Sequence, residues 1–314
     1  MKKFLSGVAS LNIVIHLHRL FTGMLRDVVD FLFIPLYLIC YPFIALCRSK
    51  EQASYPHKFG VCVIIKNEAS YIKEWLDYYL VLGASVFYIY DNDSDDNVLE
   101  VLNPYIDRGE VKYQKIHGKS RQLDAYTLCC KKYKKDCEYI AFYDIDEFVY
   151  LSPRKRIIDV INENFSKHDD MGALALNWMI FGSGHLEKKI DAPVIERFKY
   201  RSETDFEKNH HIKSIVNPRK VTVFRNPHFA FMQKGWHTYS VLGERVDDAF
   251  VTKINEEIRI NHYFCKSKEE YAIKKVKGLA DQLGERAIND FNDHDKNDVF
   301  DDSMNPYVEM IKNR

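Results

Sequence analysis

Two aspartates, Asp144 and Asp146, have the clearest chemical potential in the sequence. They stand two positions apart, directly after the apolar run Tyr139–Tyr143. If the strand pattern continues through them, both carboxylates point to one side while Ile145 points into the fold. Two carboxylates repel each other unless a cation lies between them, and such oxygen ligands commonly bind Mg²⁺ or Mn²⁺. We therefore predict a Mn²⁺ or Mg²⁺ site at this pair, where the metal could bridge a diphosphate and stabilise a leaving group.

The aspartates end an alternation of apolar runs and helical patterns that begins near Phe59. Strands are predicted at 59–65, 86–90, 111–116 and 139–143, and helices at 71–82, 97–106 and 120–133. Strands joined by helices of this length pair in parallel with right-handed crossovers. The expected fold class is therefore α/β, a mostly parallel sheet flanked by helices.

Polar residues follow each of these predicted strands. They are Lys66, Asn67 and Glu68 after the first strand, Asp91–Asp95 after the second, Gly118–Gln122 after the third and Asp144–Glu147 after the fourth. Ligands of parallel sheets bind beyond the carboxyl ends of the strands, where these groups should converge. Each cluster alone could be a solvated turn, but their convergence predicts a binding site.

Several segments, in this order, resemble the GT-A glycosyltransferases of the family 2 and family 92 group, and most closely the family 92-like proteins. They are Ile64–Ala69, Glu74–Leu76, Tyr88–Asp95, Gln122, Ala125–Tyr126, Tyr143–Phe148, Asn177–Gly184, Lys213–Pro218 and Asn261–Ser267. The resemblance covers roughly Gly60 to Glu270. It implies a Rossmann-like GT-A fold and an inverting, metal-dependent transfer of sugar from a nucleotide-sugar donor to a glycan or lipid-linked acceptor.

The resemblance also implies roles for the matching residues. The donor's base and ribose would be bordered by Lys66, Asn67, Glu68 and Asp91, and its phosphates or sugar would be approached by Arg121, Gln122 and Lys266. The metal would be held by Asp144, Asp146 and His262. The acceptor would meet the loop from Trp178 to His185, with Phe181 between them. This loop is one residue shorter than the usual family loop, so the resemblance does not define how it would bind an acceptor.

An inverting transferase needs a carboxylate within hydrogen-bond reach of the acceptor hydroxyl. Glu203, Asp205 and Asp247 are candidates for this base, and each also fits an ordinary surface acid. Two other functions stay open. One is a haloacid-dehalogenase-like phosphatase that uses the Asp144 and Asp146 pair, although that family usually carries the motif on its first strand. The other is a catalytically inactive, membrane-bound scaffold.

The chain as a whole has no charge bias. It has 314 residues, with 45 Lys and Arg against 45 Asp and Glu. A neutral chain has no net field to attract nucleic acid, so we expect no nucleic-acid partner. The hydrophobic fraction of 46% supports a sizeable core. The sequence divides into an apolar segment (residues 1–50), a catalytic domain (residues 58–288) and an acidic tail (residues 289–314), with a loop or frayed end expected at Asp290–Asp302.

The first fifty residues are expected to form a hydrophobic helical extension that associates with a membrane. Phe31–Cys47 contains 17 residues without a charge, which as a helix would span ~26 Å, slightly short of the ~30 Å hydrocarbon core. Pro35 and Pro42 would kink it, so a single span, an interfacial anchor and a helical hairpin packed on the catalytic domain all remain open. Seven cysteines without metal-ligand spacing favour a reducing compartment. We therefore expect the cytoplasmic face of a bacterial inner membrane, and a role in surface polysaccharide or glycolipid synthesis.

Overall fold

The computed structural model describes residues 54–151, 155–277 and 289–314. The expected membrane-associating segment lies outside these residues. Within the described part of the chain, no helix is long and apolar enough to cross a membrane.

The described residues form strands and helices that alternate through the first half of the domain. The strands are β1 (His57–Ile65), β2 (Val86–Asp91), β3 (Val111–Lys115), β4 (Cys137–Phe142), β5 (Glu147–Leu151), β6 (Met171–Ile180), β7 (Tyr200–Arg201), β8 (Ile212–Val216), β9 (Val221–Phe224), β10 (Ala230–Met232), β11 (His237–Ser240), β12 (Arg245–Val246), β13 (Ile258–His262) and β14 (Val299–Phe300). The helices are α5 (Ala69–Leu82), α6 (Val98–Asp107), α7 (Gln122–Tyr133), α8 (Ile157–Phe165), α9 (Val194–Arg197), η1 (Glu207–His210), α10 (Lys268–Lys277), α11 (Asp290–His294) and α12 (Asn305–Lys312). The seven elements predicted between residues 59 and 143 are all present, with ends shifted by a few residues.

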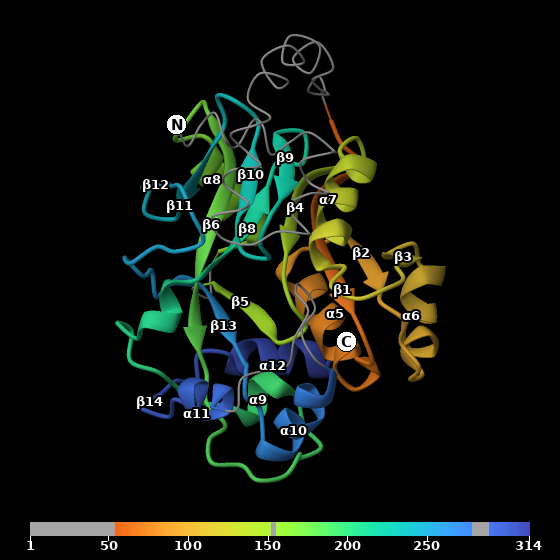
Figure 1. Cartoon of the computed structure of the whole chain (residues 1–314), viewed down its shortest axis with the longest axis vertical. Helices are drawn as coiled ribbons and strands as arrows, with labels where there is room; N and C mark the ends of the chain where they lie inside the picture. Colours follow the sequence, from red (N-terminus) through yellow and green to blue (C-terminus); the bar gives the residue numbers. More distant parts are fainter. Residues whose placement is uncertain (1–53, 152–154, 278–288) are drawn as a thin grey trace.

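A single twisted sheet runs through the domain in the order β12-β11-β6-β8-β4-β1-β2-β3 (Figure 1). Strands β4, β1, β2 and β3 are parallel neighbours, and β11 and β13 are parallel to β6. Strand β8 is antiparallel to both β4 and β6 and joins the two halves. Strand β13 also pairs with β5, antiparallel. The predicted α/β class with a mostly parallel sheet is confirmed.

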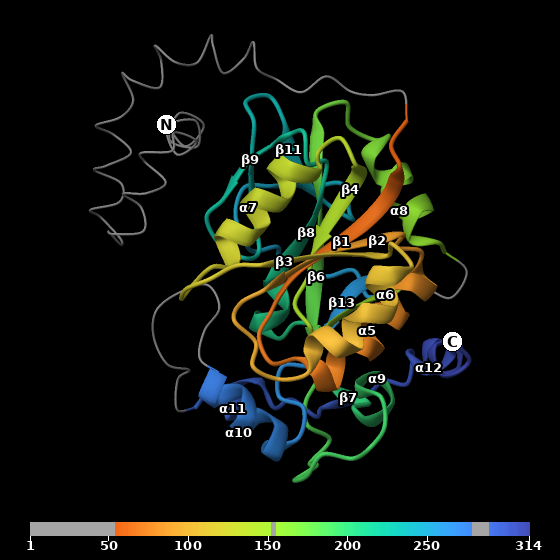
Figure 2. The same cartoon turned by 90° about the vertical axis from the view of Figure 1, so that its right-hand side faces the viewer.

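Helices cover both faces of this sheet (Figure 2). On one face, α5, α6, α8 and α12 pack in a large core with the side chains of Phe59, Val61, Val63 and Ile65 from β1. On the other face, α7 packs against the alternate residues of the same strands, among them Cys62. Because β1 is buried on both faces, it reads as a continuous apolar run and not as an alternating one.

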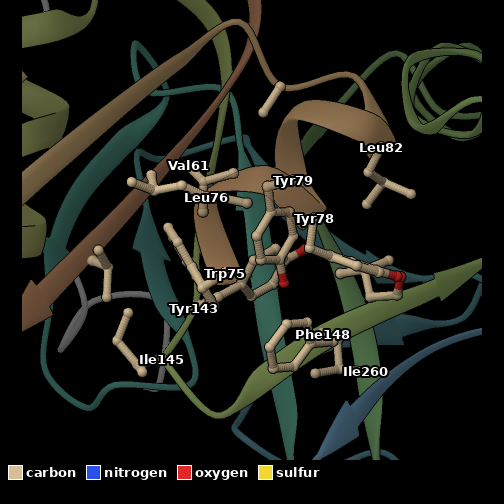
Figure 3. Close-up of a cluster of buried hydrophobic side chains, with 14 of the residues drawn as sticks. Val61, Trp75, Leu76, Tyr78, Tyr79, Leu82, Tyr143, Ile145, Phe148 and Ile260 are labelled. Atoms are coloured by element: carbon tan, nitrogen blue, oxygen red, sulfur yellow. The ribbon is translucent and has the colours of Figure 1, made fainter. Parts of the chain in front are cut away.

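Aromatic side chains of α5 position the turn that carries the two aspartates (Figure 3). The indole Nε1 of Trp75 donates to the carbonyl oxygen of Asp144 at 3.1 Å, and the Tyr79 hydroxyl donates to the carbonyl oxygen of Glu147 at 3.0 Å. The ring of Tyr78 packs edge-on against Phe148, with 5.1 Å between their centroids. Helix α5 therefore holds the backbone on both sides of the Asp-x-Asp turn.

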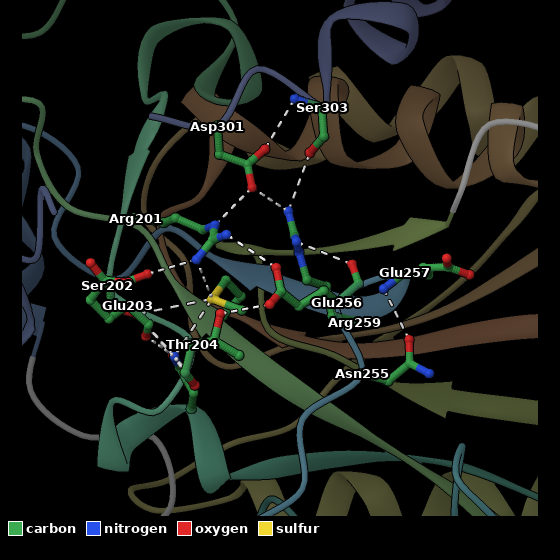
Figure 4. A network of polar contacts seen from close by, with 12 residues as sticks. Arg201, Ser202, Glu203, Thr204, Asn255, Glu256, Glu257, Arg259, Asp301 and Ser303 are labelled. Atoms are coloured by element: carbon green, nitrogen blue, oxygen red, sulfur yellow. Dashed lines mark hydrogen bonds and ion pairs between the residues drawn. The ribbon is translucent and has the colours of Figure 1, made fainter. Parts of the chain in front are cut away.

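The C-terminal residues belong to the folded domain, which differs from the loop or frayed end expected for them. Asp301 accepts hydrogen bonds from Arg201 Nε at 2.9 Å and from Arg259 Nη2 at 2.6 Å (Figure 4). Burial raises the pKa of Asp301, but Arg259, Ser303 and Arg201 together outweigh it and the net pKa is lowered. Helix α12 then buries an apolar stripe, Met304, Tyr307, Val308 and Ile311, in the main core. The amphipathic pattern of α12 is short and follows an acidic stretch, so it was not recognised in the sequence.

Candidate active site

The Asp-x-Asp motif lies in a tight turn between β4 and β5, at the carboxyl edge of the parallel strands. Strand β4 ends at Phe142, and Glu147 N donates to the carbonyl oxygen of Asp144 at 3.1 Å. The backbone of Asp146 is fixed from a distance, because Tyr263 N donates to its carbonyl oxygen at 2.8 Å. The strand alternation expected through the motif is therefore replaced by a turn, and the two carboxylates have separate partners.

Both carboxylate oxygens of Asp144 are engaged by side chains. Oδ1 accepts hydrogen bonds from Gln122 Nε2 at 2.8 Å and from the Tyr126 hydroxyl at 3.2 Å. Oδ2 accepts one from Lys213 Nζ at 2.7 Å. Helix α7 supplies the first two donors and β8 supplies the lysine. The predicted site residue Gln122 is thus brought to Asp144, where it orients the carboxylate.

Lys213 and Glu147 lie next to each other beneath Asp144, and neither side chain is exposed. Their Nζ and Oε1 atoms are 3.6 Å apart, and Glu147 also accepts from Trp178 Nε1 at 2.9 Å and from Asp144 N at 2.9 Å. Burial lowers the pKa of Lys213, but Asp144 and Glu147 outweigh it and the net pKa is raised. Burial raises the pKa of Glu147. Lys213 is therefore the cation that balances this group of acids.

Asp146 is almost buried and faces a cation on one side and an imidazole on the other. Its Oδ2 lies 2.5 Å from Lys274 Nζ, and its Oδ1 lies 3.5 Å from His262 Nε2. Burial raises the pKa of Asp146, but Lys274 and His262 outweigh it and hold the pKa well below its usual range. Asp146 is therefore an ionised carboxylate with a strong electrostatic need for a cation.

His262 is the last residue of β13 and is brought to Asp146 as the sequence predicts. Burial lowers its pKa to about 4, so the imidazole is neutral at pH 7. Its Nδ1 is buried and has no hydrogen-bond partner. A neutral imidazole beside an ionised carboxylate fits a divalent metal. No group of three His, Cys, Asp or Glu side chains in the described residues is placed to hold one, so this pair would need ligands from water or a bound diphosphate.

The residues predicted to border the nucleotide fasten the loops after β1 and β2 to each other. Asp91 accepts hydrogen bonds from Ser94 N at 2.9 Å and from the Tyr113 hydroxyl at 2.5 Å. Asn67, which has a positive φ of 56°, accepts from Asp95 N at 2.8 Å through its Oδ1. These contacts place both loops at the same edge as Asp144. They leave the side chain of Lys66 exposed at the rim.

Glu68, Arg121 and Lys266, the other residues predicted for the donor site, make contacts other than those that join the two loops. The carbonyl oxygen of Glu68 accepts from the first turn of α5, so this residue begins the helix. Arg121 pairs with Asp124 at 3.0 Å, while its buried Nε has no hydrogen-bond partner. Lys266 is nearly buried, with its Nζ 4.2 Å from the centroid of the Tyr71 ring. Arg121 and Lys266 thus place positive charge on two sides of the edge.

The loop predicted to receive an acceptor is largely covered. Phe181 is fully buried and packs against Tyr263, with ring centroids 4.8 Å apart. Trp178 is also buried and stacks on His211 at 4.9 Å. His185 is exposed. The structure therefore uses Phe181 and Trp178 as packing residues and leaves His185 at the surface.

Substituting Gly182 by alanine should destabilise the fold, because this loop packs directly on the segment after α11. A Cβ at Gly182 would lie 2.2 Å from the carbonyl oxygen of Lys296 and 2.5 Å from Asn297 Oδ1. We expect a loss of about 2 kcal/mol or more in the free energy of unfolding, measured by urea denaturation. Lys188→Ala, at an exposed position nearby, is the control. An unchanged midpoint for Gly182→Ala would contradict the close packing.

The three acids predicted as base candidates are exposed, and none has a described contact with the aspartates. Glu203 and Asp205 lie in the loop between β7 and η1, and Asp247 follows β12, where Arg245 Nε lies 3.3 Å away. The structure instead adds imidazoles near Trp178. Nδ1 of His211 and Nδ1 of His228 each lie 3.1 Å from a backbone carbonyl oxygen. A carbonyl only accepts, so each Nδ1 carries the hydrogen and each Nε2 holds a lone pair.

Lys213 and Lys274, the cations that contact the two aspartates, were not predicted as site residues. Lys213 begins one of the segments that carry the resemblance, and its place in a buried strand was a signal, because a lysine there requires an acidic partner. Lys274 lies in a polar helical stretch without any such signal. Pairings that join residues 69 and 128 positions apart do not follow from local periodicity.

Comparison with known proteins gives a consistent family assignment. A glycosyltransferase family 92 protein of Oryza sativa subsp. japonica is 32% identical over 135 residues, which is 43% of this chain and 23% of the relative. The galactan beta-1,4-galactosyltransferase GALS1 of Arabidopsis thaliana is 28% identical over 133 residues, 38% of this chain and 26% of the relative. The chain thus spans about a quarter of the length of these relatives. A structure of S. aureus TarS, residues 1–349, has a TM-score of 0.33 at 16% identity, covering 51% of this chain and 47% of that one.

The sequence model described as Glycosyltransferase family 92 matches residues 57–293, which is most of the chain and includes the Asp-x-Asp turn, Lys213, His262 and Lys274. The resemblance seen in the sequence is confirmed by this match. The chain belongs to glycosyltransferase family 92.

Proposed function

We propose that this chain transfers a sugar from a nucleotide-sugar donor to a glycan or lipid-linked acceptor. The observation that carries the proposal is the arrangement at the carboxyl edge of β1, β2 and β4. There, the ionised Asp146 and the cations Lys213 and Lys274 lie at the edge where the loops after β1 and β2 are joined through Asn67. Acidic groups that bind a metal and cations that bind phosphate are both needed to hold a sugar nucleotide. Membership of family 92 supports the same reaction class.

A divalent cation, Mn²⁺ or Mg²⁺, is part of this proposal. Asp146 and His262 would hold it, and when bound it would supply Lewis-acid stabilisation of the diphosphate leaving group. Asp144 has a different task, because Gln122, Tyr126 and Lys213 already engage both of its oxygens. We expect Asp144 to orient the turn that carries Asp146.

The proposed reaction is a direct displacement with inversion at the anomeric carbon. The oxygen of an acceptor hydroxyl forms a bond to that carbon, and the bond from the carbon to the phosphate oxygen breaks with its electron pair. Lys266 and Arg121 would stabilise the charge that develops on the diphosphate. The hydroxyl proton passes to a base, for which Glu203, Asp205 and Asp247 stand as the sequence candidates and the Nε2 atoms of His211 and His228 as further acceptors.

The donor sugar and the cellular location complete the proposal. Because a relative is named a galactan beta-1,4-galactosyltransferase, UDP-galactose is the first sugar nucleotide to test. The apolar Phe31–Cys47 stretch supports a membrane-bound enzyme on the cytoplasmic face of a bacterial inner membrane, acting in surface polysaccharide or glycolipid synthesis. The family match disfavours the phosphatase alternative, since the matching family is one of glycosyltransferases.

Isothermal titration calorimetry with UDP, GDP and UDP-galactose, with and without Mn²⁺, tests the proposal. We expect metal-dependent binding to the wild type and at least a hundredfold weaker binding to Asp146→Asn, because the variant loses the charged ligand. The matched control is Asp169→Asn, an exposed aspartate at the opposite end of β6. Absence of nucleotide binding under every metal condition would reject the donor site and favour the inactive scaffold.

A further inference from the structure

The ammonium of Lys274 lies in a position suited to a metal cation. Its Nζ lies 2.5 Å from Asp146 Oδ2 and donates to the carbonyl oxygen of Phe264 at 2.9 Å. The ring of Phe264 adds a third favourable surface, with its centroid 4.0 Å from Nζ. Carboxylate and carbonyl oxygens are also the ligands that hard divalent cations prefer. Lys274 is therefore held by groups that would equally hold such a cation.

Asp146 cannot accommodate both cations in this geometry. His262 Nε2 faces the other carboxylate oxygen at 3.5 Å and the residue is nearly buried, so little room or solvent remains around it. Two positive charges that share one buried oxygen repel each other strongly, because water does not screen them. A divalent cation that binds Asp146 must therefore displace the ammonium.

The helix that carries Lys274 is anchored one turn before it. Glu270 N donates to Ser267 Oγ at 3.3 Å and Ser267 N donates to Glu270 Oε2 at 3.1 Å, a capping box that begins α10. Glu270 also accepts two hydrogen bonds from Arg197, at 2.8 and 2.9 Å, and one from the Tyr71 hydroxyl at 2.9 Å. These buried contacts fix the first turn of the helix. A lysine side chain has several rotatable bonds, so Lys274 can leave Asp146 without movement of α10.

We propose that Lys274 is an internal countercation of Asp146, which a divalent metal displaces so that the ammonium becomes available to the donor's diphosphate. This inference rests on the proposed transferase function. Before metal binding, Lys274 keeps the buried carboxylate ionised and oriented. After displacement, the ammonium is still tethered next to the site, where the diphosphate provides a new anionic partner.

The proposal predicts effects of opposite sign for a single substitution. In Lys274→Gln the competitor of the metal is gone, so Mn²⁺ alone should bind roughly tenfold more tightly, the size of one charge-assisted contact. Binding of UDP at saturating Mn²⁺ should become roughly tenfold weaker, because the ammonium no longer contacts the diphosphate. A residue that merely supports the fold would weaken both.

The experiment uses the purified full-length chain in a non-ionic detergent. Free Mn²⁺ is quantified by electron paramagnetic resonance without nucleotide, and UDP binding by calorimetry at saturating Mn²⁺. Lys275→Gln is the matched control, since it removes the same charge from an exposed neighbour. Lys274→Arg keeps a competing cation and should retain the weak Mn²⁺ binding of the wild type. Circular dichroism confirms that each variant is folded.

Each outcome separates this inference from the function on which it rests. Unchanged or weaker Mn²⁺ binding by Lys274→Gln would overturn the displacement, even if UDP still binds. Tighter Mn²⁺ binding with unchanged UDP affinity would overturn the second contact, to the diphosphate. Failure of wild type and variants alike to bind UDP would reject the transferase function itself.

Discussion

Replacing Lys213 by methionine should lower the free energy of unfolding by about 3 kcal/mol, because removal of one partner leaves buried charge uncompensated. Lys213 Nζ is 2.7 Å from Asp144 Oδ2 and 3.6 Å from Glu147 Oε1, and both Lys213 and Glu147 are fully buried. Methionine keeps an unbranched chain up to the Cε position and lacks only the ammonium, so the loss is mainly electrostatic and not that of a large cavity. Urea denaturation at pH 7 measures it, with the exposed Lys188→Met as control.

The deficit of Lys213→Met should grow as the pH rises above about 8. Burial raises the pKa of Glu147 from its ordinary value of 4.5 to about 8 in the wild type, and loss of Lys213 raises it further, so the two proteins differ in bound protons only above about pH 8. Between the unfolded and folded pKa the folded state holds the extra proton, so stability falls as pH increases through that window. Adding Glu147→Gln should restore part of the loss and flatten the pH dependence. A deficit that is the same at about pH 7 and about pH 9.5 would contradict the pairing.

Ending the chain after Asp302 should prevent stable folding. The removed segment contributes Met304, Tyr307, Val308 and Ile311 to the main core, and the Tyr307 hydroxyl donates to the carbonyl oxygen of Leu151 at 2.9 Å. A buried aromatic alone costs about 3–5 kcal/mol when truncated to alanine. Loss of the whole stripe therefore approaches the total stability of about 5–15 kcal/mol that a domain possesses. Soluble yield and urea denaturation measure the effect.

Single substitutions on α12 resolve this prediction where the truncated chain cannot be purified. Tyr307→Ala should destabilise by about 3 kcal/mol or more, while Met310→Ala on the exposed side of the same helix should change stability by less than about 0.5 kcal/mol. Equal effects at the two positions would mean that the helix does not bury one face. A truncated chain with the wild-type midpoint would refute the contribution of α12 altogether.

The first half of the fold was predictable because each element there has a complete local pattern. The β1 run Phe59–Ile65 is apolar on both faces, and the helical spacing of Ile72, Trp75, Leu76 and Tyr79 marks α5. The order of these elements implied parallel pairing. It therefore also implied that Asp91 and Asp144 lie at the same edge of the sheet. The second half has shorter strands, some of two to four residues, in which a period of two cannot be recognised.

The site was predictable where it follows from strand order and not where it depends on long-range pairing. Gln122 was expected at this edge from the strand order and His262 from the family resemblance, and both contact the aspartates. Lys274 was not expected, since an exposed-looking helix gives no sign that one of its lysines turns inward. Phe181 was expected at a binding surface, but its glycine-containing loop is buried by the segment after α11, which sequence alone placed in a separate tail.

The separation in sequence between the acids and their cations also orders the assembly of the nascent chain. Lys213 follows Asp144 by 69 residues, and Lys274 follows Asp146 by 128. At roughly 5–20 residues per second of synthesis, the second interval lasts about 6–26 s. During that time the Asp-x-Asp turn and Glu147 keep their charges in water, because burial without partners is too costly. The acids therefore delay closure of the domain until translation has delivered the cations that complete it.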